Sequence, residues 1–145
     1  MAALKMITCV ISGKEIQKRK SKLVLDHRVC PEVEGMAKGL LIDAVSVFIW
    51  GWKKHNKSAR NRTMSLAYCV SVITACTEAY GCEPTVFVTE LGRQAEAAGE
   101  DVSMVFFSKL LDFISGDPVP ELEKPNVQKA IRMGVEAFKE QVAEQ

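Results

Sequence analysis

The sequence predicts a mainly α-helical protein, in which an N-terminal β-hairpin is followed by about five helices packed as a compact helical domain. Before Pro31, apolar and polar residues alternate, whereas after it apolar residues recur at intervals of three and four. The chain has 145 residues, 48% of them hydrophobic and 26% charged, which suits one globular domain with a real core. We therefore expect a single domain, 1–145, with a hairpin over 1–30 and a helical core over 31–145.

The hairpin is predicted from two alternating segments, MITCVIS at residues 6–12 and SKLVLDHRV at residues 21–29. Between them lies GKEIQKRK, which is polar, begins with Gly13, and is predicted to be a basic loop. An isolated hairpin is only marginally stable in water. We therefore expect it to pack on the helices or to pair with a second copy of the chain.

Five helical segments are predicted after the hairpin. Pro31 suits a helical first turn, and Gly51, Gly81 and Gly99 suit helix ends. The fourth segment, MVFFSKLLDFI, is apolar around most of its circumference, which indicates a central core helix or an interface helix. The residues of GDPVPELEKP, with three prolines, are predicted to connect it to the last helix. The expected helices span about 31–51, 63–80, 84–98, 101–115 and 125 to the C-terminus.

The net charge of +1 conceals a division of charge along the chain. Residues 1–62 contain 13 Lys and Arg against 5 Asp and Glu, whereas residues 63–145 contain 6 against 13. The net charges of the two parts are therefore +8 and −7. Such a division predicts either a functional basic surface or two parts of one domain that neutralise each other.

The basic residues of the first part form two clusters, which are the predicted nucleic-acid-binding residues. Lys and Arg side chains, helped by Asn, Ser and helix N-termini, are what proteins use to contact phosphates. Two tryptophans, Trp50 and Trp52, flank the second cluster, and we expect one in the core and the other near the surface, with Trp52 the candidate to stack on a base. The hairpin cluster is Lys14, Lys18, Arg19, Lys20, Lys22 and Arg28; the second, in WKKHNKSARNRT, is Lys53, Lys54, Lys57, Arg60 and Arg62.

Chemistry at the hairpin is the other possibility that the sequence raises. Cys9, His27 and Cys30 come close if the strands pair, but three ligands do not complete a structural zinc site. The same segment resembles the HNH nuclease family in Cys9, Gly13 and the Asp26-His27 pair. It departs from that family at Ser12, where the second knuckle cysteine belongs, and in lacking an Asn and a His on a following helix. We predict neither a metal, a cofactor nor an enzymatic activity.

Two function classes remain. The first is a non-enzymatic nucleic-acid-binding protein that contacts phosphates through the two clusters, with RNA or single-stranded DNA favoured over duplex. The alternative is a protein-interaction adaptor or inhibitor, which would use its charge division to recognise a charged partner surface or for self-association. Self-association into a homo-oligomer would double the basic surface. Five cysteines without a leader sequence or CxxC spacing favour reduced thiols and a cytoplasmic protein, and no apolar run is long enough to cross a membrane.

Overall fold

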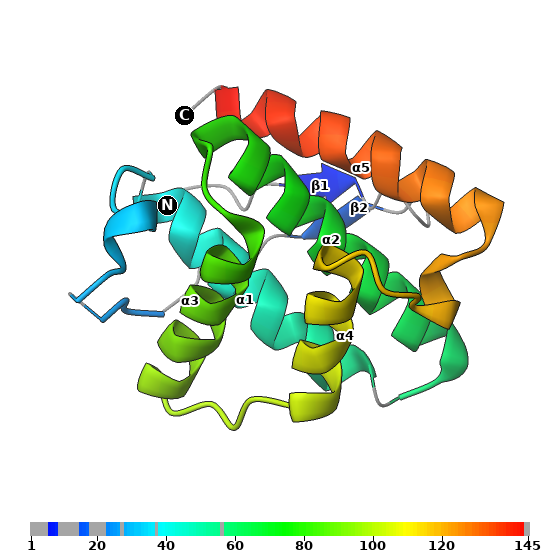
Figure 1. The fold of residues 1–145 in the computed structure, drawn as a ribbon, viewed down its shortest axis with the longest axis horizontal. Helices are drawn as coiled ribbons and strands as arrows, with labels where there is room; N and C mark the ends of the chain where they lie inside the picture. Colours follow the sequence, from blue (N-terminus) through cyan, green and yellow to red (C-terminus); the bar gives the residue numbers. More distant parts are fainter. Residues whose placement is uncertain are drawn as a thin grey trace.

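Helices make up most of the described chain, as predicted. The computed structural model describes residues 6–8, 15–17, 23–26, 28–36, 38–55 and 57–143. This part of the chain holds five α-helices and two short 3₁₀-helices, η1 (Pro31–Val33) and η2 (Pro120–Leu122), arranged as in Figure 1. The α-helices are α1 (Lys38–His55), α2 (Ala59–Tyr80), α3 (Pro84–Ala97), α4 (Met104–Ile114) and α5 (Pro125–Ala143).

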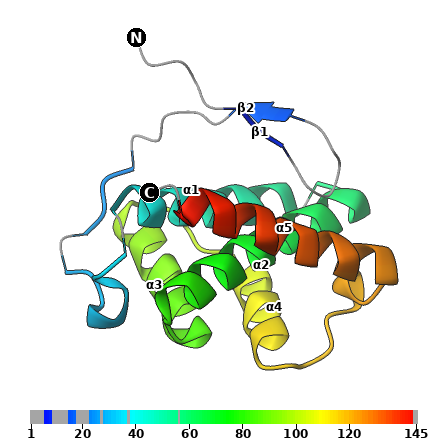
Figure 2. The ribbon, with the colours of Figure 1, turned by 90° about the horizontal axis from the view of Figure 1, so that it is seen from above.

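Helix α2 is the centre of the fold, because it packs against each of the other four α-helices and against η2. Figure 2 shows α5 crossing α2, while α3 and α4 lie beside each other. The hydroxyl of Ser58 accepts a hydrogen bond from the Asn61 N–H and caps the start of α2. Gly81, at φ 66°, ends the helix in the left-handed conformation that glycine adopts without strain, as the sequence predicted.

The core draws residues from all five α-helices, and the part of it where α1, α2 and α4 meet requires a glycine. Phe48 and Phe106 are fully buried with ring centroids 6.1 Å apart. A Cβ on Gly51 would lie 2.5 Å from the Cys69 Sγ and 2.6 Å from a ring carbon of Phe106. The absence of a side chain at position 51 therefore lets three helices approach closely.

The predicted ends of the first two helices are wrong at Gly51 and Thr63. Gly51 lies inside α1, which continues to His55, and α2 begins four residues before Thr63. At its other end, α1 begins at Lys38, because residues 31–33 form η1 and the exposed Gly35 follows that short turn. The segment WKKHNKSARNRT is therefore mostly helical, because α1 ends at His55 and α2 begins at Ala59.

The second strand predicted for the hairpin is not found among the described residues. The described residues 23–26 and 28–30 form no strand; we call residues 23–30 the N-terminal strap. The alternation of apolar and polar residues suggests a strand, but the strap hydrogen-bonds to α3 instead. The Asp26 N–H donates to the Gln94 Oε1 at 2.8 Å. The short strands β1 (Met6–Thr8) and β2 (Glu15–Gln17) pair in antiparallel fashion with Ile7 opposite Ile16, so the partner of the first strand comes from the predicted loop. The hairpin with strands at 6–12 and 21–29 is therefore not confirmed.

Candidate nucleic-acid interface

The second basic cluster lies where α1 ends and α2 begins; we call residues 53–62 the α1–α2 corner. Two contacts shape it. His55 is buried against Phe106, with ring centroids 5.4 Å apart, and fixes the last turn of α1. The Lys57 N–H donates to the Lys54 carbonyl at 3.1 Å, after which Ser58 caps α2. Lys53 and Lys54 thus lie on the last turn of one helix, and Arg60 and Arg62 on the first turn of the next.

The cations of the α1–α2 corner differ in their partners. The Lys53 Nζ lies 3.1 Å from a carboxylate oxygen of Glu100, in an exposed ion pair. In the described part of the chain, no carboxylate lies within 4 Å of the side-chain nitrogens of Lys54, Lys57 or Arg62. Lys57 is exposed, whereas Lys54 and Arg62 are half-buried. The side chain of Arg60 lies outside the described part.

Most ion pairs of the described acidic residues after position 62 are with cations of that same part. Among the described residues, Lys109 pairs with Glu121, Lys139 with Glu78, and Arg93 with Glu90. Within residues 53–62, the described link to that acidic part is Lys53 to Glu100. The idea that the two parts neutralise each other therefore receives little support at the α1–α2 corner.

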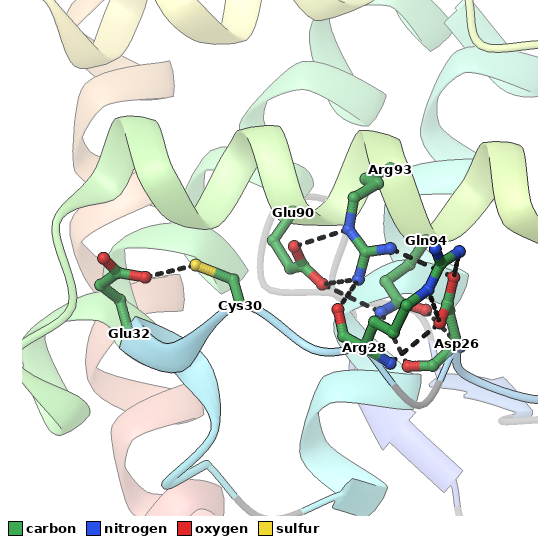
Figure 3. Close-up of polar contacts among 7 residues, drawn as sticks. All are labelled: Asp26, Arg28, Cys30, Glu32, Glu90, Arg93 and Gln94. Carbon is green, nitrogen blue, oxygen red and sulfur yellow. Dashed lines mark hydrogen bonds and ion pairs between the residues drawn. The ribbon is translucent and has the colours of Figure 1, made fainter.

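Arg28, the described member of the first cluster, belongs to a polar network between the strap and α3 (Figure 3). Its guanidinium contacts the Asp26 carboxylate at 3.0 Å, although the Arg28 side chain is 76% exposed. Hydrogen bonds from the Arg28 side chain and backbone lower the pKa of Asp26 far below its ordinary value, with a smaller contribution from Arg93. Arg28 is thus an ion-paired residue of the strap, already beside a carboxylate.

Helix α3 supplies the other half of this network. Arg93 donates to both carboxylate oxygens of Glu90, at 3.0 and 2.6 Å, and to the Arg28 carbonyl at 2.6 Å. Glu90 is only 4% exposed; burial raises its pKa, but hydrogen bonds from Arg93 and Gln94 outweigh burial, so that its pKa is lowered. Sequence reasoning missed this network, because the contacts that join the strap to α3 connect residues more than 60 positions apart.

The metal hypothesis concerned Cys9, His27 and Cys30, of which Cys9 and His27 lie outside the described residues. The Cys30 thiol donates to the Glu32 carboxylate, and this contact raises the pKa of the thiol (Figure 3). Among the residues that the structure describes, no group of three or more His, Cys, Asp or Glu side chains could hold a metal ion. The described surroundings of Cys30 thus supply a hydrogen-bonded thiol, and the hypothesis of a metal at Cys9, His27 and Cys30 stays untested.

The two tryptophans divide as predicted between core and surface, but in the opposite assignment. Trp52 is 6% exposed and packs on Phe48 with ring centroids 5.0 Å apart. Trp50 is half-buried, and its ring meets the Tyr68 ring edge at 5.5 Å. Of the two indoles, Trp50 is the one within reach of a ligand.

The remaining predicted residues of the first cluster, Lys14, Lys18, Arg19, Lys20 and Lys22, lie outside the described residues.

None of the helices described here is both long enough and apolar enough to traverse a bilayer. Comparison with family models, curated proteins and solved structures finds no match for this chain. The case for a function therefore depends on the physical chemistry of the chain alone.

Proposed function

We propose that this protein binds nucleic acid, without catalysing a reaction, by contacting phosphates at the α1–α2 corner. One observation carries the proposal: Lys54, Lys57 and Arg62 gather at a single turn, and no described carboxylate lies within 4 Å of their charged groups. Cations without a carboxylate beside them can neutralise the phosphates of a polyanion, and the release of its condensed counterions favours binding. A surface pair with Glu100 is weak enough for Lys53 to exchange its partner for a phosphate.

The start of α2 adds to this preference for anions. The helix has 22 residues, and its aligned peptide groups place partial positive charge at Ala59 and Arg60. Ser58 occupies the Asn61 N–H, which leaves the preceding N–H groups of the first turn available to a phosphate oxygen. Backbone donors and the cations of the α1–α2 corner then lie at one turn of the chain.

The experiment measures binding of a fluorescently labelled single-stranded oligonucleotide by anisotropy over a range of salt concentrations. The test variant is Lys54→Gln, Lys57→Gln and Arg62→Gln. Its matched control removes the same charge from exposed cations of the α5 start, by Lys124→Gln, Lys129→Gln and Arg132→Gln. Thermal melts of all three proteins show whether each variant is folded.

We expect the corner variant to lower the slope of log affinity against log salt by about 2, since each phosphate contact to a single strand contributes about 0.7. The control is expected to keep the wild-type slope. An equal loss in both variants would mean that net charge, and not the α1–α2 corner, holds the oligonucleotide. Failure of the wild-type protein to bind any oligonucleotide at low salt would overturn the proposal in favour of a protein partner.

A further inference from the structure

A groove opens next to the α1–α2 corner, on the same side of α1 as its lysines. Its volume is about 620 Å³, within the range of about 300–1,000 Å³ typical of small-molecule sites. One wall is the strap at Leu23 and Val24, and another is α1 at Ile49 and Trp50. The end of α3 closes it, with Glu100 among the lining residues.

The lining suits a flat, neutral ring. Six of its eight lining residues have apolar side chains, and one of them, Trp50, has an indole that packs edge-on against the Tyr68 ring of α2. Every nucleobase has a π face that can stack on an aromatic side chain, so such stacking does not depend on the sequence of the nucleic acid. The carboxylate of Glu100 disfavours an anion inside the groove, but it can accept hydrogen bonds from base N–H groups.

The groove and the basic turn share a border. Lys53 and Lys54 follow Trp50 by three and four residues, so all three lie on one side of α1. Lys53 is bound to Glu100, the lining residue, with an Nζ–oxygen distance of 3.1 Å. A base in the groove would therefore place the phosphate attached to it beside these two lysines. The opposite wall begins at Leu23, which directly follows Lys22 in the sequence.

We infer that the groove beside Trp50 holds an unpaired nucleobase of a single-stranded nucleic acid, whose phosphates run over the α1–α2 corner. The inference rests on the proposed function and narrows its ligand from nucleic acid in general to single strands. Bases in a duplex are stacked and paired, so they cannot enter a lateral groove without being unpaired first. RNA and single-stranded DNA share the chemistry that the groove recognises.

Two variants test the groove separately from the lysines. Trp50→Leu removes the stacking ring, with Trp50→Phe as the conservative variant that keeps one. Ala97→Leu fills the groove from an exposed position at the end of α3 and does not change Trp50 itself. It therefore tests the groove even if a Trp50 variant does not fold. Each is titrated with RNA and DNA single strands of one sequence, with the corresponding duplex, and with an abasic strand.

We expect Trp50→Leu and Ala97→Leu to weaken binding of single strands roughly 5- to 150-fold, since that is the range for one stacked base. Trp50→Phe should recover most of the affinity. None of the three should change the salt slope, the binding of duplex or the binding of the abasic strand. A difference between the RNA and DNA arms would identify the natural ligand.

The outcomes separate the two proposals. Unchanged affinity of folded Trp50→Leu and Ala97→Leu for single strands, with the corner variant still impaired, would overturn the groove inference and leave the phosphate contacts standing. The same loss of affinity for the abasic strand would also overturn it, because no base is present there to stack. Absence of binding by the wild-type protein would overturn both.

Discussion

Substitution of Gly51 by alanine tests how closely α1, α2 and α4 approach one another. The new Cβ would lie 2.5 Å from the Cys69 Sγ and 2.6 Å from Cζ of Phe106, both far inside van der Waals contact. Neither neighbour can move easily. The Cys69 thiol donates to the Val47 carbonyl at 3.4 Å, and the Phe106 ring is fully buried against Phe48.

The expected magnitude follows from two opposing effects. Overpacking a close-packed core costs about 1–3 kcal/mol, while alanine gains about 1 kcal/mol over glycine in a helix interior. Together these two effects give a net loss of about 0–2 kcal/mol in the free energy of unfolding. For a domain of this size a loss of about 2 kcal/mol lowers the melting temperature by roughly 4–8 °C.

The control is Gly39→Ala in the same helix, where a Cβ would meet nothing within 4 Å. It should stabilise the protein by up to about 1 kcal/mol, because it brings the helix propensity without the clash. Urea unfolding of both variants measures the difference. Adding Cys69→Ala should reduce the cost of Gly51→Ala, since it removes the nearer contact. Equal stability changes in Gly39→Ala and Gly51→Ala would refute the close approach of the three helices.

Other outcomes follow from the strap and the thiols. Arg93→Met should destabilise the protein by roughly 2 kcal/mol, because it leaves the buried Glu90 without its cation, whereas Glu90→Gln should cost less; urea unfolding compares them. Acid should weaken the strap, because the pKa values of Asp26 and Glu90 are lowered on folding. Their contribution to stability is complete above the ordinary values of 3.8 and 4.5, begins to be lost as the pH falls below those values, and is gone below the folded-state values. A flat stability between pH 6 and pH 3 would contradict this. Burial raises the pKa of Cys69, and burial and then Asp43 raise the pKa of Cys76 to about 12, so iodoacetamide should label these two thiols only after unfolding, as read by peptide mass mapping.

The helices after residue 58 were predictable because their apolar stripes and end signals agree. The stripe of Leu66, Ile73 and Tyr80 marks α2, and Gly81 follows where the helix ends. The polar turns of the α1–α2 corner were not predictable in this way. Residues 53–55 and 59–62 carry few apolar side chains, so a reading based on periodicity stops before the helices do.

The strap shows a different limit. Its alternation of Leu23, Val24, Leu25 and Asp26 resembles a strand locally, and a local pattern cannot reveal that a helix 68 residues away supplies the bonding groups. The burial of Glu90 and Gln94 could not be predicted from the sequence for the same reason: their charge and polarity are satisfied by residues that only the tertiary fold brings near. The groove, built by the strap, α1 and the end of α3, also depends on contacts that no single segment encodes.

The correction at the α1–α2 corner changes what its cations can do. On a flexible connector, each lysine would lose backbone as well as side-chain freedom on meeting a phosphate, which costs free energy. Here Lys53 and Lys54 belong to a helix whose end is fixed by the buried His55, and Arg62 belongs to a helix capped by Ser58. The backbone positions of these cations are therefore set before any ligand arrives, as is their placement beside Trp50. When a single-stranded nucleic acid binds along the groove and the turn, only the protein side chains and the nucleic acid itself lose conformational freedom. Removal of the indole should then weaken the stacking of a base, and removal of the charges should weaken the phosphate contacts.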